Sequence, residues 1–308
     1  MRRKNFGGAK IMLAVENPGI RQGLQNALQQ TGFPRAVEIT ALDRMIATLT
    51  EARFDLILST TELGAEFLPP FMLQLRQGAL VHHPLPVIVQ FLHSAEHDYV
   101  RKVIDSGPDD LLQMPVVPAQ LLTRLGLLAE KPRNFIVTSD YVGPDRRKTP
   151  RPGAQAPLTI DVPNPLALRL AQKSDQAVLA EVTASADRLR LMRLARYIFE
   201  LQWLLRAIRA LFEQGSDDLA RLISFCERIK ILLNGLPRLM PDGLPEQVVP
   251  LVEKLETGSN ILMKKGLSAD KTILQGLSFM ITSLARALRE TLPPDLMEAA
   301  GPAPAAAS

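Results

Sequence analysis

The chain has 308 residues, 46% of them hydrophobic and 22% charged, and a formal net charge of +4. This length corresponds to about two domains, and the composition excludes wholesale disorder. Its one cysteine, Cys226, excludes an intramolecular disulfide and the usual cysteine-rich zinc sites. The apolar run after the basic first residues is too short for a secretory signal, and no run approaches a membrane span. We therefore expect a cytoplasmic protein.

Short aliphatic runs alternate with amphipathic stretches through the first 131 residues. The aliphatic runs predict strands at 10–15, 36–40, 54–60, 84–92 and 109–115. The amphipathic stretches predict helices at 18–32, 42–52, 70–79, 96–107 and 118–131. Apolar residues recur at helical spacing in these stretches, whereas the strands are almost continuously aliphatic, as is typical of strands buried on both faces. The alternation predicts a five-stranded parallel sheet covered by helices over residues 9–131.

The next segment, 132–165, changes to a composition rich in proline, glycine and charge, which predicts a linker. It carries a basic cluster: Arg146, Arg147, Lys148 and Arg151. A solvated linker explains this cluster, because no aromatic residues are interleaved with it. A contact with a phosphate or an acidic protein is the alternative.

Residues 166–292 predict an all-α helical bundle or dimerisation domain. Glycine and proline breaks divide this region into helices at about 174–214, 216–233, 246–265 and 269–292. The last residues, 293–308, are of low complexity and predict a disordered tail.

Three sequence stretches, in order and at regular intervals, resemble the receiver domains of two-component response regulators. These are AVENPGIRQGL after the first strand, FDLILST on the third, and SGPDDLLQMP around the fifth. The resemblance covers about residues 9–130 and implies a flavodoxin-like α/β fold. The region after residue 131 resembles no family that we recognise.

The resemblance also implies where a phosphoryl group would be accepted. Receiver chemistry needs an aspartate nucleophile, carboxylates for Mg²⁺, a hydroxyl and a lysine at the carboxyl ends of the strands. The matching positions form a degenerate phosphoacceptor pocket: Val15 and Glu16 at the acidic pair, Thr60 at the acceptor, Phe91 (or Gln90) at the hydroxyl, and Met114 before Pro115 at the lysine. We expect a cis peptide bond between Met114 and Pro115.

The longest predicted helix carries apolar residues spaced alternately by three and four. This seam consists of Leu191, Leu194, Ile198, Leu201, Leu205, Ile208 and Phe212. Such a pattern is typical of a helix that packs along one partner helix. It predicts either the central helix of a monomeric bundle or an interface for a homodimer or another partner. Arginines on the same helix form no single stripe, which disfavours a DNA-recognition helix.

The resemblance to receiver domains, with the missing pocket groups, implies a phosphorylation-independent signalling adaptor of two-component type that acts through protein–protein interaction. We expect no enzymatic activity, no cofactor and no metal, because no nucleophile–base pair or metal cluster can be assembled. The expected partners are signalling proteins, and a nucleic-acid partner is not favoured. The alternative is a response regulator with a nucleic-acid-binding helical output domain.

Overall fold

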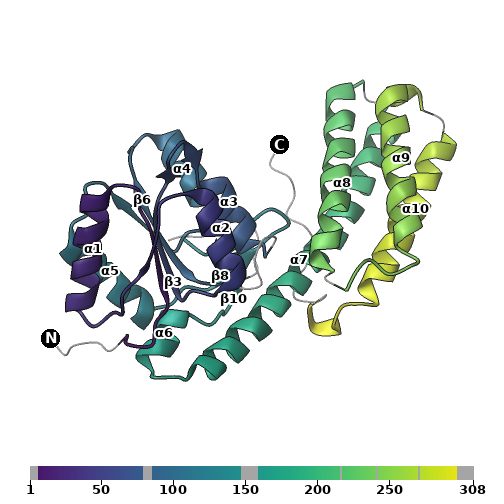
Figure 1. Ribbon diagram of the computed structural model, residues 1–308. Coiled ribbons are helices and arrows are strands. Elements are labelled where there is room, and N and C mark those ends of the chain that lie inside the picture. Colours follow the sequence, from purple (N-terminus) through teal and green to yellow (C-terminus); the bar gives the residue numbers. More distant parts are fainter. Residues whose placement is uncertain are drawn as a thin grey trace. The chain divides into compact units, whose positions relative to one another are not determined.

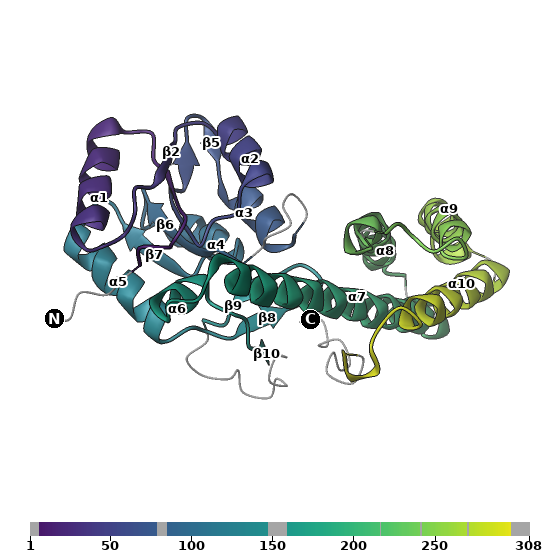
Figure 2. The same ribbon diagram turned by 60° about the horizontal axis from the view of Figure 1, so that its bottom comes forward.

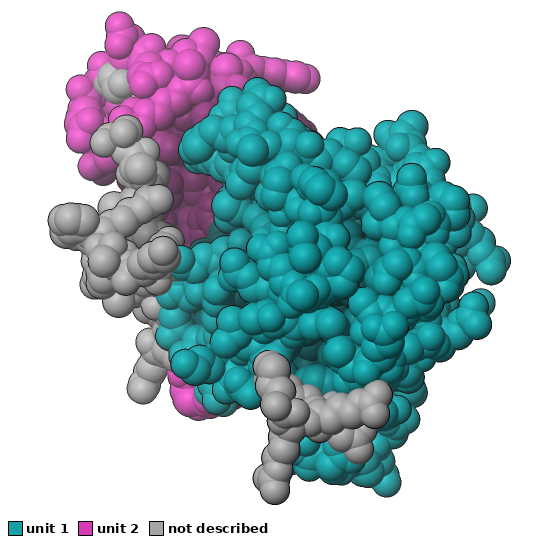
Figure 3. All heavy atoms as spheres, turned by 90° about the vertical axis from the view of Figure 1, so that its left-hand side faces the viewer, with its two compact units in different colours: residues 1–150, 159–189 teal, residues 151–158, 190–308 magenta. Residues whose placement is uncertain are grey.

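The computed structural model describes residues 6–78, 85–146, 159–215, 217–240, 242–269 and 271–296. These residues form two compact units, coloured separately in Figure 3. The described residues up to 146, together with 159–189, make unit 1, and those from 190 onward make unit 2. The prediction of an α/β domain followed by a helical region is confirmed.

Unit 1 is built around a five-stranded parallel sheet of order β2-β1-β3-β6-β7 (Figure 1). Its strands are β1 (Ile11–Ala14), β2 (Val37–Ile39), β3 (Leu56–Thr60), β6 (Val87–Leu92) and β7 (Asp110–Gln113). The helices that alternate with them are α1 (Pro18–Gln30), α2 (Leu42–Glu51), α3 (Pro69–Arg76), α4 (His97–Asp105) and α5 (Pro118–Glu130). This strand order is that of a flavodoxin-like doubly wound fold.

The sheet has a hydrophobic core on each face, because successive side chains of a strand point to opposite sides. Leu56 and Leu58 of β3 share one core with side chains of α1 and α5. Ile57, between them, belongs to the other core, with side chains of α2 and α3. Figure 1 shows α1 and α5 on one side of the sheet and α2 and α3 on the other.

The linker predicted for 132–165 needs correction in its described part. Strands β8 (Phe135–Val137), β9 (Val142–Pro144) and β10 (Thr159–Ile160) form a three-stranded antiparallel sheet. All three residues of β8 are buried, and the Arg76 guanidinium lies 5.2 Å from the centroid of the Phe135 ring. The short apolar runs were hidden by their proline- and glycine-rich surroundings. A second short hairpin, β4 (Glu62–Leu63) and β5 (Glu66–Phe67), also escaped prediction.

Two glycines allow the β8–β9 hairpin to pack directly on the turn before β7. Gly107 has φ +78°, and a Cβ there would meet the Val142 carbonyl oxygen at 2.8 Å. A Cβ on Gly143 would approach the Gly107 Cα to 3.0 Å.

Beyond the hairpin, Arg146 donates a hydrogen bond to the Pro108 carbonyl, and burial lowers the pKa of Arg146. This member of the basic cluster therefore binds its own chain, and the other three lie outside the described residues.

The helices after this sheet also belong to unit 1, so the predicted domain boundary near residue 166 moves to 189/190. Helix α6 (Pro165–Leu170) carries Arg169, which is buried and forms an ion pair with buried Asp55 at 2.8 Å. Arg169 also contacts Asp175, the first residue of α7 (Asp175–Glu213), at 2.5 Å. Arg169 first, and then Lys10, lowers the pKa of Asp175. These contacts between residues far apart in the sequence assign α6 and the start of α7 to unit 1.

Unit 2 is the predicted helical bundle. It contains the remainder of α7, then α8 (Leu219–Leu239), α9 (Val249–Lys265), a short 3-10 turn (Gly266–Ser268) and α10 (Lys271–Arg289). Leu296, in the predicted tail, is only 3% exposed, which corrects the tail prediction at its start. Residues 297–308 lie outside the described part. Within the described ranges, none of the helices combines the length and apolar character that crossing a membrane requires.

Candidate functional site

The predicted pocket residues converge where the parallel strands of unit 1 end. Val15 directly follows β1, Thr60 is the last residue of β3, and Phe91 pairs with Thr60 across the β3–β6 ladder. Val15 and Phe91 are fully buried, and Thr60 is 4% exposed. In doubly wound folds, ligands bind at this carboxyl edge of the sheet. Here the centre of the edge is closed by two apolar side chains and a threonine.

The hydroxyl of Thr60 is occupied by backbone contacts. It donates to the Glu62 carbonyl at 2.5 Å, with the Ala14 carbonyl 3.4 Å away. A buried hydroxyl is costly to leave without a partner, so these contacts hold the side chain in place. Thr60 therefore joins the end of β3 to β1 and to the β4–β5 hairpin.

Glu16 supplies the one carboxylate among the six predicted pocket residues. It is exposed, and its Oε2 accepts a hydrogen bond from the Gly64 backbone N–H at 3.1 Å. Gly64 has φ +65° and lies in the turn between β4 and β5. Arg21 donates to the Val15 and Glu16 carbonyls at 2.7 and 2.8 Å, which fixes the chain after β1. Among the described residues, no group of three or more His, Cys, Asp or Glu side chains is placed to hold a metal ion.

Met114 and Pro115 follow β7, and the peptide bond between them is cis, as predicted. The Met114 backbone N–H donates to the Leu92 carbonyl at 2.9 Å, and its side chain packs partly buried against the α1/α5 core. Gln90 was the alternative to Phe91 at the position where receiver domains carry a hydroxyl. Gln90 Oε1 accepts from Ser106, just after α4, at 3.3 Å, whereas Phe91 belongs to the α1/α5 core. Phe91 therefore lies on the same side of the sheet as Met114.

Sequence reasoning missed a pair of hydroxyls beside the pocket. Thr61 is fully buried, and its Oγ1 is hydrogen-bonded to the Tyr99 hydroxyl on α4. The Tyr99 hydroxyl also donates to Glu62 Oε1 at 3.4 Å. Burial raises the pKa of Tyr99, and the Glu62 carboxylate adds to this effect. No local pattern identifies this pair, because it joins the end of β3 to a helix 38 residues later.

The apolar seam of α7 lies in the core of unit 2. Ile198 and Leu201 are fully buried, and Leu205 is 7% exposed. Leu194 and Ile208 are also buried, and Leu191 and Phe212 pack partly buried against the same cluster. Side chains of α8, α9 and α10 complete this cluster, so the seam is covered by the chain's own helices. Of the two alternatives for the seam, the structure supports the central helix of a bundle. A homodimer through the C-terminal helices stays a prediction.

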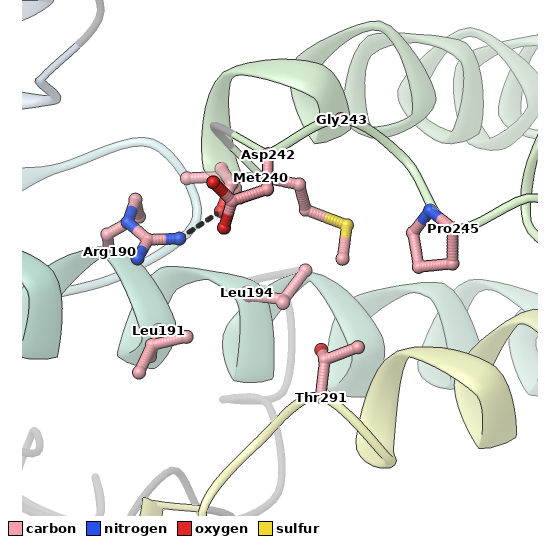
Figure 4. Close-up of a pocket in the computed structure, with 9 residues that line it drawn as sticks. Arg190, Leu191, Leu194, Met240, Asp242, Gly243, Pro245 and Thr291 are labelled. Atoms are coloured by element: carbon pink, nitrogen blue, oxygen red, sulfur yellow. Dashed lines mark hydrogen bonds between the residues drawn. The ribbon is translucent and has the colours of Figure 1, made fainter.

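Unit 2 also contains a pocket of about 310 Å³, shown in Figure 4. It is lined by Arg190, Leu191, Leu194, Leu239, Met240, Asp242, Gly243, Pro245 and Thr291. Arg190 Nη1 donates a hydrogen bond to the Leu239 carbonyl at 2.8 Å, which connects α7 to the end of α8. The lining combines one cation, one carboxylate and one hydroxyl with apolar walls. It supplies no histidine or cysteine that would act as a base or nucleophile.

Comparison with family models gives no match, and comparison with curated proteins gives none either. Among solved structures, the chain is similar to a response regulator protein from Burkholderia pseudomallei, whose crystal structure has a phosphorylated aspartic acid, calcium ion and citrate. The match has 17% sequence identity and a TM-score of 0.32, and it covers 40% of this chain and 76% of that chain. Independently of that match, the five-stranded parallel sheet of unit 1 and its flanking helices fit a receiver fold.

Proposed function

We propose that this protein is a signalling adaptor of two-component type that works without phosphorylation. The observation that carries this proposal is Thr60 at the end of β3. Phosphoryl transfer in receiver domains needs a carboxylate nucleophile at that strand end. Thr60 is instead a residue only 4% exposed, and its hydroxyl is hydrogen-bonded to backbone carbonyls.

The surrounding positions support the same reading. Magnesium needs several oxygen ligands, commonly one or two carboxylates together with phosphate and water. Glu16 is the single carboxylate at the predicted acidic pair, and its partner position holds the buried Val15. Met114 and Phe91 offer neither the cation nor the hydroxyl that would hold phosphoryl oxygens. A transferred phosphoryl group would therefore lack its nucleophile, part of its metal site and its stabilising cation.

An adaptor of this kind acts through its surfaces rather than through a reaction. We infer that the partners are other signalling proteins, which bind to exposed surfaces of the two units. We also infer that the chain has no enzymatic activity of its own. The pocket of unit 2 has no histidine or cysteine in its lining to serve as a base or nucleophile.

Phosphoryl uptake provides the test. The full-length protein is incubated with acetyl phosphate and Mg²⁺, and its intact mass is measured beside a receiver protein that has the acceptor aspartate. We expect the reference protein to gain a phosphoryl group and this chain to gain none. An added phosphoryl group that is lost in mild base, as an acyl phosphate is, would refute the proposal.

A further inference from the structure

Helix α10 exposes an aromatic side chain on a cationic surface. Its 19 residues include no aspartate or glutamate, and both Arg286 and Arg289 lie in its last turns. Exposed residues recur along one side at spacings of three and four: Thr272, Gln275, Phe279, Thr282, Arg286 and Arg289. Phe279 is 71% exposed, more than any other large hydrophobic residue in the described part of the chain.

The end of α7 runs beside this side of α10. Arg209 Nη2 donates to Ser278 Oγ at 2.5 Å, and Arg289 Nη2 donates to Gln202 Oε1 at 3.1 Å. These two contacts place the helices antiparallel, and Figure 2 shows α10 along this part of α7. Arg206 is exposed and lies on α7 between Gln202 and Arg209. It therefore borders the same surface as the exposed residues of α10.

This surface carries four arginines, and two exposed carboxylates, Glu213 and Glu290, each follow one of them by a helical turn. We call Arg206, Arg209, Phe279, Arg286 and Arg289 the arginine face. Arg209 and Arg289 donate hydrogen bonds to the neutral side chains of Ser278 and Gln202. In the described part of the chain, no carboxylate lies within ion-pair distance of Arg206. Arg286 lies 3.9 Å from Glu290, but both side chains are exposed, so water weakens that pair. The face thus presents four guanidinium groups on the same side of the two helices as one exposed apolar ring.

We propose that the arginine face docks an acidic segment of a partner protein. Carboxylates of that segment would pair with the guanidinium groups, which bind carboxylates bidentately, and an apolar side chain would cover Phe279. The proposal deepens the adaptor function and rests on it, because it specifies the chemistry of the partner. The buried side of α10 belongs to the core of unit 2, so its exposed side is free for a partner without unfolding the bundle.

The observations favour a protein partner over a nucleic acid. Single-stranded nucleic acids bind surfaces on which successive bases stack on several aromatic side chains. The arginine face has one aromatic residue. The other aromatic residues of α7 and α8 lie in the core of unit 2 or pack partly buried against it: Tyr197, Phe199, Trp203, Phe212 and Phe225. Guanidinium groups at helical spacing around a single ring fit a helical or extended acidic peptide with one apolar anchor.

Fluorescence anisotropy with the full-length protein tests this proposal. The probe is a fluorescein-labelled synthetic peptide of glutamates interrupted by leucine and phenylalanine. A second probe replaces each glutamate with lysine, and a third is a single-stranded RNA of equal charge to the first. We expect the acidic peptide to bind, more weakly at higher salt, and the lysine peptide not to bind. RNA that binds more tightly than the acidic peptide would overturn the proposal, as would no binding of the acidic peptide.

Variants then locate the site. The double change Arg206→Glu with Arg286→Glu should weaken binding of the acidic peptide by at least about tenfold, and Phe279→Ser should weaken it severalfold. Ile231→Ser is the matched control, since Ile231 is 57% exposed on α8; it should leave binding unchanged. Circular dichroism verifies that each variant is folded. Equal binding by wild type and the double variant would refute the site. The phosphoryl test reads unit 1 alone, so the two proposals can fail separately.

Discussion

At the scale of single residues, the end of β3 decides whether unit 1 can accept a phosphoryl group. Thr60→Asp places a carboxylate at that strand end, among the buried Val15 and Phe91. We expect this variant to take up no phosphoryl group from acetyl phosphate. Glu16 is the single carboxylate of the acidic pair and Met114 stands at the lysine position, so the metal and the transferred oxygens are poorly held. Intact-mass measurement after incubation verifies this. Rapid labelling of the single variant would show that the rest of the pocket is still competent.

A triple variant is the matched comparison. Val15→Asp, Thr60→Asp and Met114→Lys together restore each kind of group that receiver chemistry needs, beside the existing Glu16. We expect slow but measurable uptake by this variant. The resemblance to receiver domains indicated each of these positions. It did not indicate Thr61 and Tyr99, because their contact depends on how α4 packs against the sheet.

At the scale of elements, α8 packs so closely on α7 that a glycine is required. A Cβ at Gly235 would lie 2.6 Å from the Tyr197 hydroxyl and 2.9 Å from its ring, and Tyr197 is 6% exposed. Replacing glycine by alanine inside a helix ordinarily gains up to about 1 kcal/mol. Here we expect Gly235→Ala to lower the free energy of unfolding by about 1–3 kcal/mol, because overpacking outweighs helix propensity.

Gly276 on α10 provides the control for that prediction. No atom outside its own helical surroundings lies within 4 Å of a Cβ built there. Gly276→Ala should therefore raise the free energy of unfolding by about 0.5–1 kcal/mol. Urea denaturation followed by circular dichroism measures both variants. Stabilisation of the same size in both would mean that α7 and α8 are not as closely packed as the structure indicates.

At the scale of the whole molecule, two natural probes report on unit 2. The chain has one tryptophan and one cysteine. Trp203 packs edge-on against Phe225 at 5.7 Å, and Cys226 is fully buried in the same core. Burial raises the pKa of Cys226 to about 11, so its thiol is protonated at neutral pH. A protonated and buried thiol is inert, and we expect it to react only after unit 2 opens.

The reactivity of Cys226 and the emission of Trp203 can report on the variant Leu205→Glu. Leu205 is 7% exposed in the core of unit 2, and an unpaired carboxylate there should cost more than about 3 kcal/mol. We expect Cys226 to become reactive towards a thiol reagent at neutral pH and the Trp203 emission to shift to that of an exposed indole. A folded monomer with an unreactive Cys226 would mean instead that the seam contacts another chain. The control is Leu179→Glu, at a position on α7 that is 45% exposed, which should leave both signals unchanged.

Local patterns in the sequence predicted much of this architecture. Nearly continuous aliphatic runs such as FDLILST predicted strands buried on both faces, and helical spacing predicted the helices between them. The order of these elements was sufficient for a parallel doubly wound sheet, because sequential strand–helix units admit few topologies. Most boundaries were correct to within three residues. The helix expected to end at 233 was predicted wrongly, because it continues through Gly235 and Pro237 to Leu239. The longest helix was expected at 174–214 and is found at Asp175–Glu213.

Tertiary structure alone decided the remainder. The heptad seam was compatible with a bundle core or a dimer contact, because spacing specifies that a helix is covered and not what covers it. Asp55 and Arg169, 114 residues apart, are brought together by folding, and their buried ion pair assigns α6 to unit 1. The β8–β9 hairpin lay in a segment with the composition of a linker, and it is ordered by packing on Gly107 and Arg76. Such contacts between distant residues leave no local pattern in the sequence, since their stability comes from burial that only the folded chain creates.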